Sequence, residues 1–338
     1  MMLDEIATLK EINYVKINVT SSDNTYAPEG PVFADIPSSY IQTLGCDWSQ
    51  MRLEDENGNP VTFWPDANGA GEVYPGYYSI WFKTEIPATG SKTFRLYCDP
   101  KSPTYTSNPT DVVNFYCDCS SLAVFADYGP HTTIDTSKYV DPPASIDVYP
   151  KETADTSTNG WFHFVYDFPA KFIIKFNFSF IDQGRGYFIY MWYNDNGTPV
   201  LYGPMLWYGG TSEANFGTNY GYKSGGTAKT LDQYDTDGQW HRILVVADNS
   251  TSTFDLFYDG SLVGQSLPFY RQSSSESGVA GVHDYFYAYS VNVGPNLSDP
   301  HVDSYIITSV QFSHAPNVSV STSWTRDASC VSRPLSLL

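Results

Sequence analysis

The chain has 338 residues, which is enough for two domains with full hydrophobic cores. With 18 Lys and Arg against 37 Asp and Glu, its formal charge of −19 repels phosphate backbones and anionic membrane surfaces, so we expect no nucleic-acid partner. The sequence contains no run of 18 apolar residues, so no membrane span is predicted.

Residues 1–12, MMLDEIATLKEI, are expected to form an N-terminal arm or one short helix. They carry Asp4 and Glu5 where a secretory signal has basic residues, and they lack its apolar segment. The rest of the sequence indicates an extracellular protein. We therefore expect either that a leader has been removed or that the protein reaches the outside by another route, as virion proteins released by lysis do.

Residues 13–112 are predicted to form a first β-sandwich domain. Val15, Ile17 and Val19 alternate with polar residues, which indicates a half-buried strand. Further strands are predicted at 50–54, 61–64, 77–83 and 93–98. Pro-, Ser- and Thr-rich sequence at 100–112 is expected to connect this domain to the next.

The series VKINVTSSD, QMRLEDENGNPV, YYSIWFKTEIP, KTFRLYCDP and NFYCDCSS resembles a β-rich domain family of unknown function. That family precedes concanavalin A-like modules in archaeal and bacterial surface proteins, and it has no known catalytic residues to transfer. The positions that match its pattern are Arg52, Asp55, Gly58, Trp81, Lys83, Leu96, Tyr97 and Asp118. Cys98, Cys117 and Cys119 replace aromatic or acidic residues of the family, which indicates a local disulfide adaptation.

The five cysteines match no zinc pattern, because Cys117 and Cys119 are separated by one residue and no second pair exists. Two interpretations remain open. The thiols are free and buried, or one or two disulfides form within the N-terminal half and leave Cys330 for an intermolecular bond. The disulfide candidates are Cys46, Cys98, Cys117, Cys119 and Cys330.

Residues 113–318 are predicted to form a second sandwich. Strands are expected at 145–149, 172–180, 187–193, 254–258, 282–293 and 304–312. Residues 240–247 are apolar on both faces, as in a strand buried inside a sandwich, and Asp259-Gly260 predicts a tight hairpin. Residues 319–338 lack periodicity and are expected to be a C-terminal arm.

The stretch DGQWHRILVVADNSTSTFDLFYDGSLVG, from Asp237 to Gly264, resembles the laminin-G and concanavalin A-like jelly rolls. The resemblance implies a surface module that binds glycans or proteins. We therefore predict an all-β chain of two β-sandwich domains, the second of them a concanavalin A-like jelly roll.

Concanavalin A-like folds include glycoside hydrolases, so catalysis has to be considered. A retaining glycosidase needs two facing carboxylates, for which a Glu-x-Asp-x-x-Glu series on one strand is the usual arrangement. The second half lacks such a series and holds three glutamates, Glu152, Glu213 and Glu276, far apart in sequence. No catalytic residue is predicted, and the protein is not expected to be an enzyme.

A calcium site is the metal hypothesis, with Asp232, Asp235 and Asp237 as ligands at the rim of the jelly roll. An ordinary turn explains the same sequence equally well, so the alternative is that no cofactor binds. His241 is expected to be a structural histidine, and the six histidines show no metal spacing.

Aromatic residues in loops rich in Asn and Gly are typical of glycan-binding surfaces, although core packing also explains them. The candidate ligand-binding residues are Tyr202, Trp207, Tyr208, Tyr220 and Tyr222. Six Asn-x-Ser/Thr sequons are candidate glycosylation sites, most of them expected to be accessible: Asn18, Asn177, Asn196, Asn249, Asn296 and Asn317.

These observations favour a non-enzymatic structural or adhesion protein located outside the cell, on a cell surface or in a virion. A virion surface subunit or an extracellular filament subunit is the specific hypothesis, with self-assembly through the terminal arms and with glycans or other surface proteins as partners. Two alternatives remain: a polysaccharide-active enzyme of the concanavalin A-like class, and a calcium-dependent carbohydrate-binding adhesin.

Overall fold

The computed structural model describes residues 11–148, 160–166, 168–180, 186–195, 198–208, 215–222, 227–233, 235–271, 282–288 and 301–326. Their regular structure is almost entirely β, as the sequence predicts. The helical elements of these residues are α1 (Ser38–Leu44) and four 3-10 turns, η1 (Trp48–Gln50), η2 (Asp66–Gly69), η3 (Pro109–Asp111) and η4 (Leu122–Val124). No described helix is long and apolar enough to cross a membrane.

Two sheets form the first sandwich. The strands of the larger sheet, in spatial order, are β24 (Asn317–Arg326), β1 (Glu11–Thr20), β7 (Lys92–Cys98), β3 (Met51–Asp55) and β4 (Pro60–Val61). The smaller sheet contains β2 (Ala27–Pro37), β6 (Tyr77–Ile86) and β5 (Phe63–Pro65). Alternate apolar residues of β1 and β6, such as Ile17 and Phe82, meet between these sheets.

Two larger sheets form the second sandwich. The inner sheet contains β10 (Thr132–Asp135), β11 (Ser145–Val148), β23 (His301–Ser309), β13 (Lys171–Ser179), β18 (His241–Asp248), β19 (Thr253–Tyr258) and β20 (Ser261–Pro268), and β8 (Phe115–Cys117) pairs with β23. The outer sheet contains β17 (Thr227–Gln233), β16 (Asn215–Tyr222), β21 (Tyr270–Arg271), β15 (Thr198–Tyr208), β14 (Gly186–Asp195), β22 (Val282–Ala288), β12 (Gly160–Tyr166) and β9 (Asp127–Tyr128).

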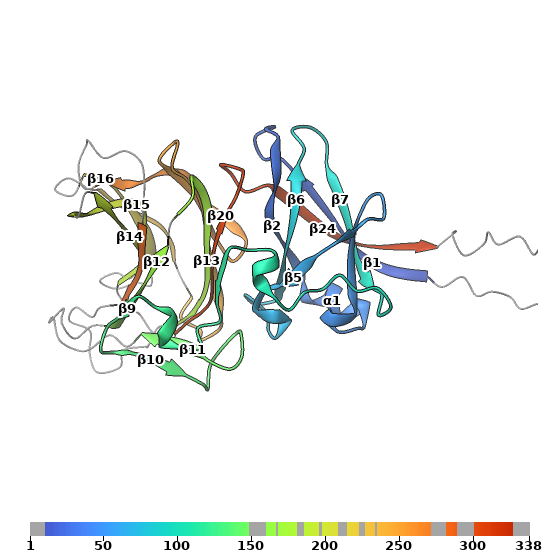
Figure 1. Cartoon of the computed structure of the whole chain (residues 1–338), viewed down its shortest axis with the longest axis horizontal. Helices are drawn as coiled ribbons and strands as arrows, with labels where there is room; N and C mark the ends of the chain where they lie inside the picture. The colour runs from blue at the N-terminus through green and yellow to red at the C-terminus, as the bar shows by residue number, and fades with distance from the viewer. Residues whose placement is uncertain are drawn as a thin grey trace, which may run out of the picture.

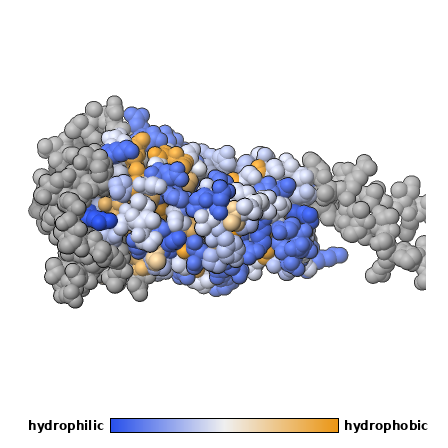
Figure 2. All heavy atoms as spheres, turned by 90° about the horizontal axis from the view of Figure 1, so that it is seen from above, coloured by the Kyte–Doolittle hydropathy of each residue, from blue (hydrophilic) through white to orange (hydrophobic). Residues whose placement is uncertain are grey.

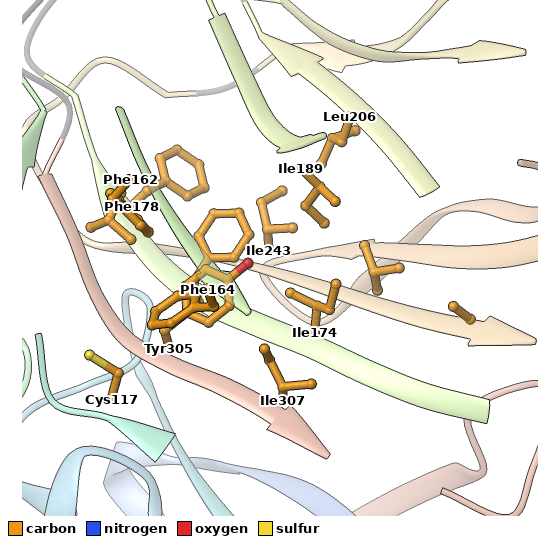
Figure 3. Close-up of a cluster of buried hydrophobic side chains, with 14 of the residues drawn as sticks. Cys117, Phe162, Phe164, Ile174, Phe178, Ile189, Leu206, Ile243, Tyr305 and Ile307 are labelled. Carbon is orange, nitrogen blue, oxygen red and sulfur yellow. The ribbon is translucent and has the colours of Figure 1, made fainter. Parts of the chain in front are cut away.

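The four sheets stack as four layers, and Figure 1 shows the outer sheet at one end and the β24–β1–β7 sheet at the other. Between the inner and outer sheets lies an aromatic-rich core (Figure 3), in which the rings of Phe176 and Tyr305 are stacked 5.3 Å apart. Figure 2 shows that hydrophilic side chains cover most of the visible face of the first sandwich.

The inner sheet is buried on both faces. Every residue of β18 is buried, as the sequence predicts for 241–247, whereas Trp240, which the prediction included, precedes the strand and is half-buried. Ile243 and Val245 of β18 pack toward the outer sheet, whereas Leu244 and Val246 pack against the first sandwich. The two domains therefore share a core in addition to the connecting segment at 100–112.

Polar residues of the inner sheet meet acids of the first sandwich inside this shared core. Lys175 Nζ lies 2.7 Å from Asp66 Oδ2, and both side chains are fully buried. The guanidinium of Arg242, which is 1% exposed, donates to both carboxylate oxygens of Asp35 at 2.5 Å. Because a buried charge is tolerated only when it is paired, these contacts fix one arrangement of the two domains.

The electrostatics of the interface follow from burial and pairing. Burial acts to raise the pKa of Asp35, but the Arg242 guanidinium outweighs it and holds this pKa below its ordinary value. Burial lowers the pKa of Lys175, against the attraction of Asp66. The guanidinium also lies 4.8 Å from the centre of the Tyr74 ring, which stabilises the cation further.

The two ends of the described chain are neighbours. β24 pairs antiparallel with β1 along its whole length, from Glu11 opposite Arg326 to Thr20 opposite Asn317. The prediction of an arm from residue 319 is therefore wrong over 319–326, because these residues complete the sheet of the first sandwich. Residues 1–10 and 327–338 lie outside the described part, and with them the remainder of both predicted arms.

Each of the two interpretations of the cysteines holds for one pair of them. Cys46 and Cys98 form a disulfide with their Cα atoms 6.1 Å apart, which ties the segment after α1 to the end of β7. Cys117 and Cys119 are free and buried, with their sulfur atoms 3.5 Å apart. Cys330 lies outside the described residues.

Removing the carboxylate of the buried ion pair should weaken the fold strongly. Asp66→Asn leaves the Lys175 ammonium without its counter-charge in a fully buried site. We expect the free energy of unfolding, measured by chemical denaturation, to fall by about 3–5 kcal/mol. The matched control is Glu85→Gln, which breaks the exposed Lys92–Glu85 pair and should cost less than about 1 kcal/mol. Equal losses for the two variants would contradict the role given to the buried pair.

Asp141, between β10 and β11, should make stability depend on pH. Burial, opposed by the hydrogen bond from the Tyr116 hydroxyl, raises the pKa of Asp141 to about 6. The protonated carboxyl therefore contributes stability that is present below about pH 4 and is lost as the pH rises through about 6. Asp141→Asn retains an acceptor for Tyr116 and removes this loss. The difference in unfolding free energy between Asp141→Asn and the unchanged protein should shift in favour of the variant by about 1–3 kcal/mol as the pH rises from about 4 to 7, measured by denaturation at each pH. A difference that is constant with pH would exclude this effect.

Candidate functional site

The outer sheet presents a face that lies away from the rest of the molecule (Figure 1). Its other face packs into the core through Phe162 and Phe164 of β12 and through Leu206 and Tyr208 of β15. Because successive residues of a strand point to opposite sides, the odd-numbered positions of these strands belong to the outer face.

Strand register aligns the backbone positions of four aromatic residues in one row across the outer sheet. Trp161 of β12 stands opposite Tyr287 of β22, Tyr287 stands opposite Tyr187 of β14, and Tyr187 stands opposite Trp207 of β15. Neighbouring strands lie about 4.8 Å apart, so the row covers about 14 Å. It has the length and the chemistry of a platform for several sugar rings.

Histidines and a tyrosine occupy the adjoining positions of the same face. His163 of β12 stands opposite Tyr285 of β22, and His283 of β22 stands opposite Trp192 of β14. Imidazole and phenol groups are proton donors and acceptors, so residue types suited to acid–base chemistry occupy positions that adjoin the aromatic positions in register. The sequence signal for these positions is the alternation of His163 and His283 with Phe162, Phe164 and Phe286, which was not used to predict a site.

Trp207 is the member of the row whose side chain is described. It is half-buried, and its ring lies over Gly217 of β16, the residue opposite it in register. A Cβ at position 217 would come within 2.5 Å of Trp207 Cζ2 and 2.2 Å of the Lys229 carbonyl oxygen. Glycine is therefore required at 217 for the indole to lie flat against the sheet.

The structure separates the five predicted ligand-binding residues. Tyr202 and Tyr208 are each 1% exposed and belong to the core, so the prediction that they bind ligand is wrong. Their even-numbered positions on β15 explain this, because they share the inward face with Leu206. The side chains of Tyr220 and Tyr222 lie outside the described part. Trp207 therefore remains as the candidate.

Two of the predicted metal ligands converge on His241 at the start of β18. His241 Nδ1 lies 2.6 Å from Asp259 Oδ2 and 3.8 Å from Asp235 Oδ2, and His241 Nε2 lies 3.2 Å from Asp237 Oδ1. Asp232 belongs to β17 and is not part of this group. The His241 side chain is buried, and a carboxylate lies beside each ring nitrogen. Burial lowers the pKa of His241, but Asp259 and Asp237 outweigh it, so the pKa lies above its ordinary value.

A cleft of about 480 Å³ lies between the two sandwiches, lined by Phe33 and Asp35 of β2, Asp255 of β19, Leu262 of β20 and His314. His314 Nδ1 lies 2.7 Å from the buried Asp255 Oδ2. Among the described residues, no hydroxyl or thiol donates to the His314 ring. The pair therefore links β19 to the segment before β24 and lacks the nucleophile that a hydrolytic triad requires.

The glutamates weighed for glycosidase chemistry, Glu152, Glu213 and Glu276, lie outside the described residues. So do the sequons at Asn196 and Asn296. Asn177 is fully buried and donates to the Val73 carbonyl, so its prediction as a glycosylation site is wrong. The polar face of β13 that carries it is covered by the first sandwich.

The remaining sequons differ in access. Asn317 is exposed, Asn18 is half-exposed, and the Asn249 amide donates to the Pro169 carbonyl oxygen at 3.0 Å.

No family model matches the chain, and no curated protein matches it. The resemblance of residues 12–120 to a surface-protein family therefore has no support from these comparisons. Solved structures do match. The alginate lyase Aly36B in complex with alginate tetrasaccharide has a TM-score of 0.41 at 10% identity, over 60% of this chain and 96% of that one.

Two further solved structures are similar. The carbohydrate esterase of Shiga toxin-encoding bacteriophage phi24B has a TM-score of 0.40 at 11% identity, over 59% of this chain and 98% of that one. The Bacteroides ovatus GH16 protein in complex with its product has a TM-score of 0.39 at 10% identity, over 57% of this chain and 99% of that one.

These matches correct two expectations. Among the proteins that this chain is similar to are a lyase, an esterase and a glycoside hydrolase family member, which contradicts the interpretation as a non-enzymatic structural or adhesion protein. The virion, filament and adhesion hypotheses are withdrawn with it. At this level of similarity the likeness is one of fold, so the activity has to be argued from the residues of this chain.

Substituting Gly217 should move the Trp207 ring although residue 207 itself is unchanged. In Gly217→Ala the added methyl group meets the Lys229 carbonyl and the indole, and both have to shift. We expect a loss of about 1–3 kcal/mol in unfolding free energy and a change in tryptophan fluorescence that is absent when Trp207 is replaced by Phe. Gly58→Ala is the control: the Cβ position there is open but φ is +82°, so this variant should lose stability through backbone strain alone and leave the fluorescence unchanged.

Proposed function

We propose that this chain is a polysaccharide-active enzyme that binds a glycan chain across the outer face of strands β12, β22, β14 and β15. The observation that supports the proposal is the register of Trp161, Tyr287, Tyr187 and Trp207 in one row. Aromatic faces stack on the apolar faces of sugar rings, and a row of them holds an extended polymer better than a single monosaccharide.

Proton transfer is the chemistry that the neighbouring positions offer. His163 and Tyr285 stand opposite each other on adjacent strands beside the row, and the His163 side chain is 8% exposed. A buried imidazole at a position that stands opposite a tyrosine in the sheet is a suitable acid–base group for cleaving a glycosidic bond. We assign to His163 and Tyr285 the role of the candidate proton-transfer pair.

The net charge restricts the substrate. A protein of formal charge −19 repels a polyanion at long range, so a uronate polymer is a poor substrate unless local cations offset that field. We therefore infer a neutral or weakly charged polysaccharide. The proposal keeps the extracellular location that the sequence composition favours.

Turnover on a panel of neutral and acidic polysaccharides tests the proposal. New reducing ends report hydrolysis, and the ultraviolet absorbance of an unsaturated product reports elimination. We expect activity on a neutral polymer. His163→Asn should lower kcat by at least about 100-fold while binding is retained.

Trp207→Ala should weaken polysaccharide binding about 3- to 10-fold, the worth of one aromatic contact. Tyr26→Ala is the matched control, because Tyr26 is 54% exposed and lies just before the start of β2, in the first sandwich. Binding without turnover on every polymer would refute the enzymatic part of the proposal. Equal effects of the two substitutions would refute the site.

A further inference from the structure

We propose that Asp235, His241 and Asp259 form a binding site for a divalent transition-metal ion at the rim of the second sandwich. The three ligand atoms, one from each residue, lie within 4.8 Å of one another. They come from the loop between β17 and β18, the first residue of β18 and the turn between β19 and β20. A metal here would join the outer sheet to two strands of the inner sheet.

The distances suit first-row metals. Metal–nitrogen and metal–oxygen bonds of about 2.0–2.2 Å place the ligand atoms of a tetrahedral site about 3.3 Å apart. The two distances from His241 Nδ1, 2.6 Å to Asp259 Oδ2 and 3.8 Å to Asp235 Oδ2, lie on either side of that value. Binding therefore requires each of these two distances to change by less than 1 Å, and the direct contact between His241 Nδ1 and Asp259 is exchanged for two bonds to the metal.

Neighbouring groups hold each ligand in place. Asp237 Oδ1 lies 3.2 Å from His241 Nε2, so it accepts the proton of that nitrogen and leaves Nδ1 for the metal. The Tyr258 ring is stacked on the imidazole, and its hydroxyl donates to Asp235 Oδ2 at 2.8 Å. Asp259 accepts from the backbone N–H of Arg242 at 2.8 Å. Ligands that are oriented in advance lose little entropy when a metal binds.

The donor set distinguishes between metals. Calcium takes six to eight oxygen ligands, whereas this group offers one nitrogen and two carboxylates. Imidazole with carboxylates suits zinc, cobalt and manganese. Asp235 is 58% exposed, so an ion has access from solvent and water can complete its coordination. The calcium hypothesis on Asp232, Asp235 and Asp237 is replaced by this arrangement, because Asp232 lies outside it.

Calorimetry with Zn²⁺ and visible absorption with Co²⁺ test the site on the full chain, independently of any enzymatic activity. We expect one equivalent to bind, with the absorption bands of a four- or five-coordinate cobalt ion, and Ca²⁺ to bind more weakly than Zn²⁺. Asp235→Asn should weaken Zn²⁺ binding at least about tenfold, and Asp237→Asn, which changes the positioning residue of His241, about tenfold or more.

Asp232→Asn is the matched control, since it makes the same substitution on an exposed aspartate three residues earlier and should leave binding unchanged. Asp235 and Asp232 are both exposed, so neither variant should impair folding, and circular dichroism verifies this. Absence of Zn²⁺ and Co²⁺ binding, tighter binding of Ca²⁺ than of Zn²⁺, or equal loss in the Asp235 and Asp232 variants would overturn the proposal.

Discussion

The contact on which the arrangement of this protein depends is the buried pairing of Lys175 and Arg242 with Asp66 and Asp35 across the two sandwiches. Each cation lies on a strand of the inner sheet, between apolar neighbours that pack the same interface. A charge in that environment is costly without its partner, so the pairing permits one relative position of the domains. The second sandwich consequently has a single free face, that of the outer sheet.

Much of the fold was predictable because alternation of apolar and polar residues is a local property. The strands around Val15, Phe82, Phe176 and Leu244 and the Asp259-Gly260 turn are found where the sequence indicates them. The burial of Lys175 and Asn177 was not predictable. A polar face in a strand pattern normally means solvent, and only the complementary acids of a distant segment show that another sheet covers it.

The candidate site was predictable only in part, because it depends on register between strands that are far apart in the sequence. Trp207 is recognisable from its sequence surroundings as a candidate for glycan binding, but Tyr202 and Tyr208 look the same until the inward face of β15 is known. Trp161 and Tyr187 join it only through the pairing of β14 with β15 and β22. In the same way, Asp259 joins His241 through a hairpin that brings β19 beside β18.

The pairing of β1 with β24 has a practical consequence for handling the molecule. Glu11 and Arg326 emerge side by side at the end of the stack that is remote from the aromatic row, three sheet spacings of about 10 Å away. A dye or a solid support attached at Glu11 or Arg326 would therefore leave that row open to a large polymer. Linkers of equal length at these two positions would be interchangeable.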